Sequence, residues 1–124
     1  MRVIAGSARS IPLKSVKGDK TRPTTDRIKE TLFNILNPYL YDAYVLDLFA
    51  GAGGLGIEAL SRGAKKAVFV DKSKEAVKII KENLSKTHFS DDADIYTGDV
   101  LDMCATMNIE KPFDVIIMDP PYGK

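Results

Sequence analysis

A glycine-rich loop between an apolar run and a helix constrains this sequence more than any other feature. Residues 44–49 (Tyr-Val-Leu-Asp-Leu-Phe) are apolar and partly β-branched, which predicts a buried strand. Three glycines follow in a G-x-G-x-x-G pattern, namely Gly51, Gly53 and Gly56. A helix is then predicted from Gly56 to Ser61. Glycines here allow a tight turn and a close approach to a ligand, although a glycine-rich turn without a ligand is the alternative.

The rest of the chain repeats this alternation of apolar runs and helical stretches. Further strands are predicted at residues 66–71, 93–97 and 113–118, and a short helix around residues 102–108. Ser73 can cap the helix between the second and third strands, whose apolar positions recur at helical spacing: Val77, Ile80 and Leu84. Apolar strands separated by helices form parallel sheets covered by helices. The sequence therefore predicts an α/β fold with a Rossmann-like half.

The last predicted strand lies close to the end of the sequence. If no strand pairs beyond it, its apolar edge is left exposed, which natural sheets avoid. We therefore expect the chain to be a fragment, with a parallel sheet truncated after the fourth strand.

A different kind of segment precedes the glycine loop. Residues 2–17 alternate loosely and contain Gly6 and Pro12, which predicts a β-hairpin or an extended arm. A helix should follow residues 21–26, end at Asn37-Pro38 and bury a stripe made of Ile28, Leu32 and Ile35 or Leu36. We expect two parts: a basic N-terminal arm and helix at residues 1–42, and a Rossmann-like cofactor-binding half at residues 43–124.

The net charge of +1 conceals an uneven distribution. Residues 1–30 contain eight basic and three acidic side chains, so this segment carries +5 and the remainder −4. A cationic arm on an acidic body attracts a polyanion to one face, although a solvated basic terminus is the ordinary interpretation.

Composition excludes several other classes of protein. The single cysteine, Cys104, cannot form an intramolecular disulfide, and one histidine, His88, leaves no metal-ligand cluster, so we expect no metal site. We interpret Cys104 as a packing residue and His88 as an ordinary loop histidine. No run approaches the roughly 18 apolar residues of a membrane helix, and no signal sequence is visible, so we expect no membrane partner and a cytoplasmic location.

Two carboxylates near the glycine loop indicate the kind of cofactor. Asp71 ends the second predicted strand, twenty residues after Gly51, where a carboxylate can bind both ribose hydroxyls. Dinucleotides and S-adenosylmethionine both suit this architecture. Asp47, four residues before Gly51, is unfavourable beside a pyrophosphate and favourable beside the ammonium of a methionine moiety. Asp99 follows the third strand and could bind an adenine amino group or, equally, serve as a helix N-cap.

The segment after the fourth strand suits methylation of a nucleobase amine. Its residues are Asp119, Pro120, Pro121 and Tyr122. An exocyclic amine is a poor nucleophile because its lone pair is delocalised into the ring. A carboxylate and a backbone carbonyl that accept its hydrogens can favour a pyramidal amine, and an aromatic ring can stack on the base. Two prolines fix φ and can hold the Pro120 carbonyl toward a cavity. The alternative is that they merely end a strand.

The sequence resembles the RsmD-type methyltransferases over all 124 residues. The resemblance rests on residues 21–27 (Thr-Arg-Pro-Thr-Thr-Asp-Arg), 32–36, 45–51, 58–64 and the Asp-Pro-Pro-Tyr segment. It implies methyl transfer from S-adenosylmethionine to N2 of a guanine in 16S ribosomal RNA. It also implies that Asp47 and the loop hold the methionine end, that Asp71 holds the ribose, and that Asp99 with Val100 holds the adenine. Members of that family continue beyond this motif.

These observations give a set of expected site residues. The cofactor site should comprise Asp47, Phe49, Ala50, Gly51, Gly53, Gly56, Asp71, Lys72, Asp99 and Val100. The catalytic segment should be Asp119, Pro120, Pro121 and Tyr122, which would receive the base. The RNA contacts should be Arg9, Lys14, Arg22, Thr24 and Arg27.

The expected substrate is ribosomal RNA, free or within an assembled or assembling small subunit, and the complete protein should be monomeric. Two alternatives stay open. One is methylation of adenine N6 or another amino group on DNA or RNA. The other is a non-catalytic RNA-binding module with a vestigial cofactor pocket.

Overall fold

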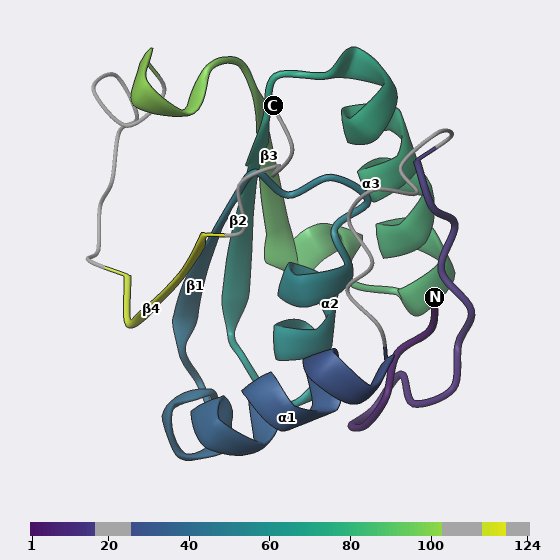
Figure 1. Ribbon diagram of the computed structural model, residues 1–124, viewed down its shortest axis with the longest axis vertical. Coiled ribbons are helices and arrows are strands. Elements are labelled where there is room, and N and C mark those ends of the chain that lie inside the picture. The colour runs from purple at the N-terminus through teal and green to yellow at the C-terminus, as the bar shows by residue number, and fades with distance from the viewer. Residues whose placement is uncertain (17–25, 103–112, 119–124) are drawn as a thin grey trace.

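The computed structural model describes residues 1–16, 26–102 and 113–118. Its centre is a four-stranded parallel sheet in the order β3-β2-β1-β4 (Figure 1). The strands are β1 (Tyr44–Leu48), β2 (Lys66–Asp71), β3 (Ala93–Thr97) and β4 (Val115–Met118). The predicted parallel α/β sheet is confirmed. The predicted short helix at 102–108 and the Asp-Pro-Pro-Tyr segment lie wholly or largely outside the described residues.

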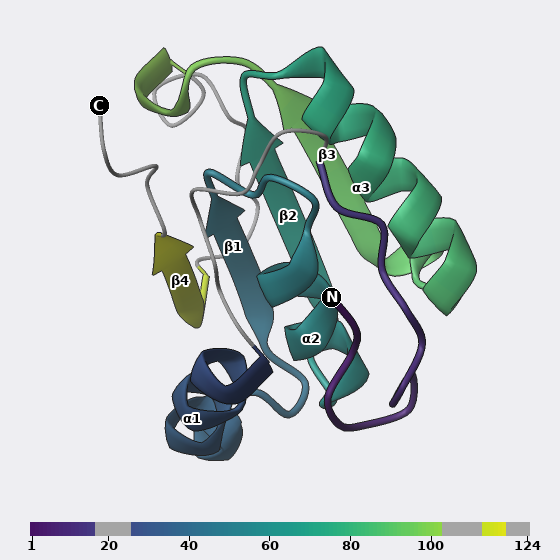
Figure 2. The same cartoon turned by 45° about the vertical axis from the view of Figure 1, so that its right-hand side comes forward.

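Parallel pairing brings the carboxyl ends of all four strands to one edge of the sheet. The central strand β1 pairs with β2 on one side, where Leu48 faces Val70, and with β4 on the other, where Leu48 faces Met118. The arrowheads of β1, β2 and β4 in Figure 2 accordingly point the same way. In folds of this kind, ligands bind beyond this edge.

Helices α2 (Gly54–Ser61) and α3 (Lys74–Thr87) pack on one face of the sheet (Figure 2). The apolar cluster on this face contains strand residues such as Val45 and Phe69, together with Ile57 of α2 and Ile80 of α3. Ser73 caps α3 by accepting a hydrogen bond from the Ala76 amide at 3.1 Å, and the predicted apolar stripe of α3 is buried. A smaller cluster on the other face comprises Leu46, Leu48, Val68 and Val70.

The buried side of α1 (Asp26–Leu36) differs from the predicted stripe. Lys29 and Phe33 are the buried residues, whereas Ile28 and Ile35 are 57% and 67% exposed. Leu32 and Leu36 are partly buried against the main core. The helix is therefore rotated about its axis relative to the prediction, so that Lys29 reaches a buried carboxylate. The short 3-10 helix η1 (Asn37–Tyr39) follows where Asn37-Pro38 was expected to end α1.

The buried carboxylate is that of Glu58 on α2, which joins three segments of the chain. Its Oε1 accepts a hydrogen bond from the Ile4 amide at 2.9 Å and lies 3.5 Å from Lys29 Nζ. Its Oε2 accepts hydrogen bonds from the Ala5 amide at 3.1 Å and from Arg62 Nε at 2.8 Å. Burial lowers the pKa of Lys29 from its ordinary value, although the Glu58 charge acts in the opposite direction. Two cationic side chains and two backbone amides thus surround one carboxylate inside the core.

The first sixteen residues form a small hairpin, here called the N-terminal arm. Arg2 and Pro12 form an antiparallel bridge, and the Val3 amide donates to the Ile11 carbonyl at 3.0 Å. Figures 1 and 2 show the arm passing α2 and running alongside α3. The hairpin predicted for residues 2–17 is confirmed for its described part. No helix in the described ranges is both long and apolar enough to cross a membrane.

Candidate functional site

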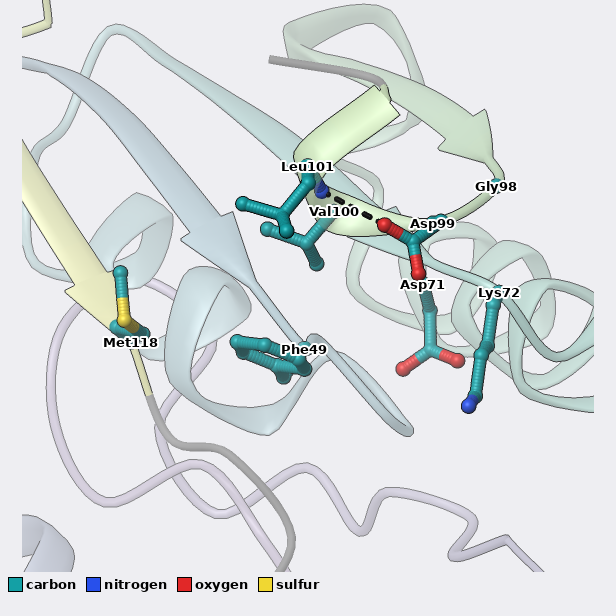
Figure 3. A pocket seen from close by; sticks show the side chains of 8 residues that line it. All are labelled: Phe49, Asp71, Lys72, Gly98, Asp99, Val100, Leu101 and Met118. Atoms are coloured by element: carbon teal, nitrogen blue, oxygen red, sulfur yellow. Dashed lines mark hydrogen bonds between the residues drawn. The ribbon is translucent and has the colours of Figure 1, made fainter.

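A pocket of about 470 Å³ lies at the carboxyl ends of the strands (Figure 3). Its lining residues end or directly follow the four strands, and they are Phe49, Asp71, Lys72, Gly98, Asp99, Val100, Leu101 and Met118. Figure 3 shows four apolar side chains, those of Phe49, Val100, Leu101 and Met118, around one part of the pocket, and Asp71 with Lys72 around another. Its volume is within the range of about 300–1,000 Å³ usual for small-molecule sites.

Asp71 connects the end of β2 to the glycine loop (residues 49–53). Its Oδ2 accepts a hydrogen bond from the Gly51 amide at 2.8 Å, and its Oδ1 accepts one from the Ser73 amide at 2.9 Å. Each carboxylate oxygen has two lone-pair sites, so these bonds leave capacity for a ligand. The carboxylate is therefore fixed in orientation at the pocket.

Two glycines, one at the end of the glycine loop and one in the first turn of α2, occupy positions at which a side chain would destabilise the fold. Gly53, the N-cap residue of α2, has φ of +84°, a left-handed conformation that favours glycine. At Gly56 an added Cβ would lie 2.4 Å from Cε2 of Phe69, a fully buried ring on β2. The helix begins at Gly54, two residues earlier than predicted. Gly56 thus allows α2 to pack closely against the sheet.

Asp47 lies beneath this loop rather than in the lining of the pocket. It is only 1% exposed, and its Oδ2 accepts a hydrogen bond from the Gly56 amide at 3.0 Å. The first amides of a helix have no partner within the helix, and Gly53 has no side chain to supply one. Asp47 therefore caps α2 from the neighbouring strand, and a favourable interaction with the helix dipole adds to this bond. Its predicted contact with a methionine group stays a prediction.

Asp99 borders the pocket after β3. Its Oδ1 accepts a hydrogen bond from the Leu101 amide at 2.9 Å, the kind of local bond that a capping aspartate makes. The structure thus supplies the contact expected of the N-cap alternative, while the pocket position is the one needed for adenine binding. The two roles are compatible because a carboxylate has a second oxygen.

The structure brings together half of the expected cofactor residues in the pocket lining. These are Phe49, Asp71, Lys72, Asp99 and Val100. Ala50, Gly51, Gly53 and Gly56 lie in the loop or in the first turn of α2 instead. Sequence reasoning missed Gly98, Leu101 and Met118 as lining residues. The signal for Met118 was its place at the end of an apolar strand, the position where pocket residues of such sheets occur.

Three of the expected RNA contacts fall within the described part of the chain. Arg9, Lys14 and Arg27 are all exposed, and Lys14 Nζ lies 3.3 Å from Glu82 Oε1. The bend of the arm is bound to the C-terminal end of α2, where the Ser7 amide donates to the Ser61 carbonyl at 2.9 Å. Arg22, Thr24 and the expected catalytic residues Asp119, Pro120, Pro121 and Tyr122 lie outside the described residues.

No group of three or more His, Cys, Asp or Glu side chains within residues 1–16, 26–102 and 113–118 could hold a metal ion. A hydrogen bond to Asp94, at the edge of the sheet opposite the pocket, raises the pKa of Lys66. Within the described part, the ionisable lining of the pocket therefore comprises Asp71, Asp99 and Lys72.

Comparison with known proteins identifies close relatives. The family described as "Conserved hypothetical protein 95" matches residues 1–124. The protein YlbH of Bacillus subtilis is 46% identical over 123 residues, which cover 98% of this chain and 67% of that protein. Ribosomal RNA small subunit methyltransferase D of Haemophilus influenzae is 42% identical over 123 residues, covering 98% of this chain and 64% of that protein.

Solved structures agree with this relationship. The structure of the Escherichia coli protein yhhF superposes with a TM-score of 0.86 at 36% identity, covering 100% of this chain and 66% of that chain. A Trypanosoma brucei PRMT1 complex, solved with AdoHcy, gives a TM-score of 0.58 at 28% identity, covering 74% of this chain and 29% of that one. The chain spans 61–67% of the length of its first relatives. Because the family matches every residue, the chain belongs to the conserved hypothetical protein 95 family, the family of the RsmD-type methyltransferases.

Proposed function

We propose that this chain binds S-adenosylmethionine and takes part in methylating an exocyclic amine of ribosomal RNA, the target being N2 of a guanine in 16S RNA. The observation that carries the proposal is the pocket at the carboxyl edge, in which Asp71 is oriented by the amide of the glycine loop. Family membership supports the reaction class, since relatives include ribosomal RNA small subunit methyltransferase D.

The lining of the pocket fits the parts of S-adenosylmethionine. Asp71 would accept hydrogen bonds from the ribose hydroxyls, and Asp99 would accept one from the adenine amine. Phe49, Val100 and Leu101 supply the apolar surface that a purine ring needs. Among the described lining residues, two carboxylates and one lysine carry charge, which disfavours a dinucleotide pyrophosphate and suits a cationic cofactor.

When bound, S-adenosylmethionine supplies an electrophilic methyl group. The contribution of the chain is to orient the amine and to exclude water. Met118 lines the pocket and directly precedes Asp119, so the Asp-Pro-Pro-Tyr segment follows from the pocket edge along the chain. In the proposal, Asp119 and the Pro120 carbonyl accept the amine hydrogens and Tyr122 stacks on the flipped base. Positioning supplies much of the barrier reduction, and the amine can lose its proton after methyl transfer.

Cofactor identity is tested by calorimetry on the chain. We expect S-adenosylhomocysteine to bind more tightly than NAD, because the described lining of the pocket has two carboxylates and, for a pyrophosphate, only Lys72 as a cationic partner. Tighter binding of NAD would overturn the proposal.

The target is tested with S-adenosylmethionine carrying a labelled methyl group, added to small ribosomal subunits and to naked 16S RNA. In a full-length version we expect the label on N2 of a guanine, and loss of transfer in Asp119→Ala with S-adenosylhomocysteine affinity nearly unchanged. Label on adenine N6 would support the alternative amino methylation. RNA binding without cofactor binding would support the non-catalytic RNA-binding module.

The N-terminal arm and the start of α1 are proposed to bind RNA phosphates. Glutamine substitutions at Arg9, Lys14, Arg22 and Arg27 should weaken RNA binding and reduce the slope of log K against log salt by about one for each lost contact. Cofactor affinity should be unaffected. An unchanged salt dependence would leave the arm with a structural role only.

A further inference from the structure

A buried asparagine on α3 joins the N-terminal arm to the glycine loop. The side chain of Asn83 is fully buried. Its Oδ1 accepts a hydrogen bond from the Lys14 amide at 2.8 Å. Its Nδ2 donates to the Lys14 carbonyl and to the Ala52 carbonyl, each at 2.9 Å. Both hydrogens of the amide group are thus used, one on each segment.

These contacts make the position of the N-terminal arm and the position of the glycine loop depend on each other. Apart from Thr87, whose hydroxyl bonds within the helix, the buried face of α3 around Asn83 is apolar, with Ile80 and Leu84 in the core. A polar amide is tolerated there only while its hydrogen bonds are made, because a buried donor without a partner loses its interaction with water. If the arm or the loop moves away, one hydrogen of Nδ2 loses its acceptor.

The same two segments carry the two binding functions proposed above. The arm contains Arg9 and Lys14, and the loop is held by Asp71 through the Gly51 amide at 2.8 Å. Lys14 itself provides the proposed phosphate contact with its side chain and the Asn83 contact with its backbone. A change at the arm therefore reaches the loop through one buried side chain.

We infer that Asn83 is a positioning residue that couples RNA binding at the arm to cofactor binding at the glycine loop. The inference rests on the proposed function for its ligands, whereas the physical link between the two segments does not. Coupling is reciprocal, so RNA tightens cofactor binding by the same factor by which cofactor tightens RNA binding.

Two variants and a matched control test the link. Asn83→Leu removes all three hydrogen bonds while keeping the same number and branching of side-chain heavy atoms, and Asn83→Asp removes both Nδ2 donations while keeping an oxygen for the Lys14 amide. Thr87→Val is the control: Thr87 is also buried on α3, one turn away, and its hydroxyl donates only within the helix, to the Asn83 carbonyl at 2.9 Å and the Leu84 carbonyl at 3.2 Å.

Hydrogen exchange of the chain without ligands measures the link itself. In Asn83→Leu we expect amides of residues 1–16 and 50–54 to exchange about tenfold faster than in Thr87→Val, after normalisation to the amides of β2. Asn83→Asp should raise exchange in the loop at least as much as in the arm. Faster exchange in only one segment, or an equal increase throughout the chain, would overturn the inference.

Calorimetry with S-adenosylhomocysteine, with and without a 16S RNA transcript, measures the functional coupling. We expect RNA to tighten binding at least fivefold in the chain and in Thr87→Val, and less than twofold in Asn83→Leu. Equal coupling in all three proteins would overturn the inference. If the chain binds no S-adenosylhomocysteine, the proposed function fails, and the exchange experiment still decides whether Asn83 links the segments.

Discussion

Replacing Asp71 by alanine separates its structural role from its proposed role in binding ribose. The substitution removes the acceptor of two backbone amides, Gly51 at 2.8 Å and Ser73 at 2.9 Å. Hydrogen bonds to charged groups contribute about 1.5–3 kcal/mol each, but Asp71 is half-exposed and water can replace it. We therefore take about 1 kcal/mol for each bond and expect the free energy of unfolding to fall by about 2 kcal/mol.

The substitution should also weaken cofactor binding, by more than the loss of folding stability alone would cause. Two ribose hydroxyls would lose their acceptor, so we expect S-adenosylhomocysteine affinity to fall by 10- to 100-fold, at about 1.4 kcal/mol for each factor of ten. The S-adenosylhomocysteine affinity of Asp71→Asn should lie between those of the unchanged chain and Asp71→Ala, because the amide side chain keeps one oxygen as an acceptor.

Urea unfolding without ligand and calorimetry with S-adenosylhomocysteine measure the two quantities separately. Asp94→Ala is the control, since Asp94 lies on the neighbouring strand and forms a half-exposed ion pair with Lys66 at 2.8 Å. A surface pair of this kind contributes about 0.2–1 kcal/mol, and cofactor affinity should not change. If Asp71→Ala bound S-adenosylhomocysteine within twofold of the unchanged chain, the ribose would not be held by this carboxylate.

Three further predictions concern the packing and charge of the core. Gly56→Ala should lower the free energy of unfolding by about 1–3 kcal/mol in urea, because its Cβ would overlap the buried ring of Phe69. Gly54→Ala should cost less, because its Cβ meets only the flexible Met1 side chain, and equal costs would contradict the packing argument. Glu58→Gln should cost about 3–5 kcal/mol, since it leaves Lys29 and Arg62 without their carboxylate, and Lys29→Met should cost less. Because burial lowers the pKa of Lys29 in the folded chain, the unfolded chain binds more protons at this site just below the ordinary lysine pKa. The stability of the unchanged chain relative to Lys29→Met should therefore rise as pH increases through this range, and a flat or falling difference in urea titrations would refute the assignment.

The strands could be predicted from the sequence because their signals are local. The strands at residues 66–71 and 93–97 have the predicted bounds, since each is a short run ended by polar or glycine residues. The Ser73 cap was predictable for the same reason, because its acceptor and donor are three residues apart. These features need no information from elsewhere in the chain.

The orientation of α1 could not be predicted, because a distant residue determines it. Periodicity favours burial of Ile28 and Ile35, yet Lys29 is buried, since Glu58 and the Arg2 carbonyl supply its partners. Asn83 was missed for a similar reason: its partners are backbone groups 31 and 69 residues away. In the candidate site, five expected cofactor residues line the pocket, whereas Asp47 occupies a capping position that spacing alone could not distinguish from ligand binding.

The arrangement of strands in the sheet also determines the order in which the strands can pair during synthesis. The central strand β1 can pair with β2 soon after both have been made. Its other neighbour, β4, joins it through contacts between residues that are 70 positions apart in the chain, such as the hydrogen bond from the Tyr44 amide to Asp114 Oδ2. Closing the longer loop costs more chain entropy and is slower. We expect β1, β2 and β3 to form first with α2 and α3, which completes the Asp71 side of the pocket. The Met118 side is then added last, so in the proposed function the half of the site that holds the cofactor would form before the half that receives the base.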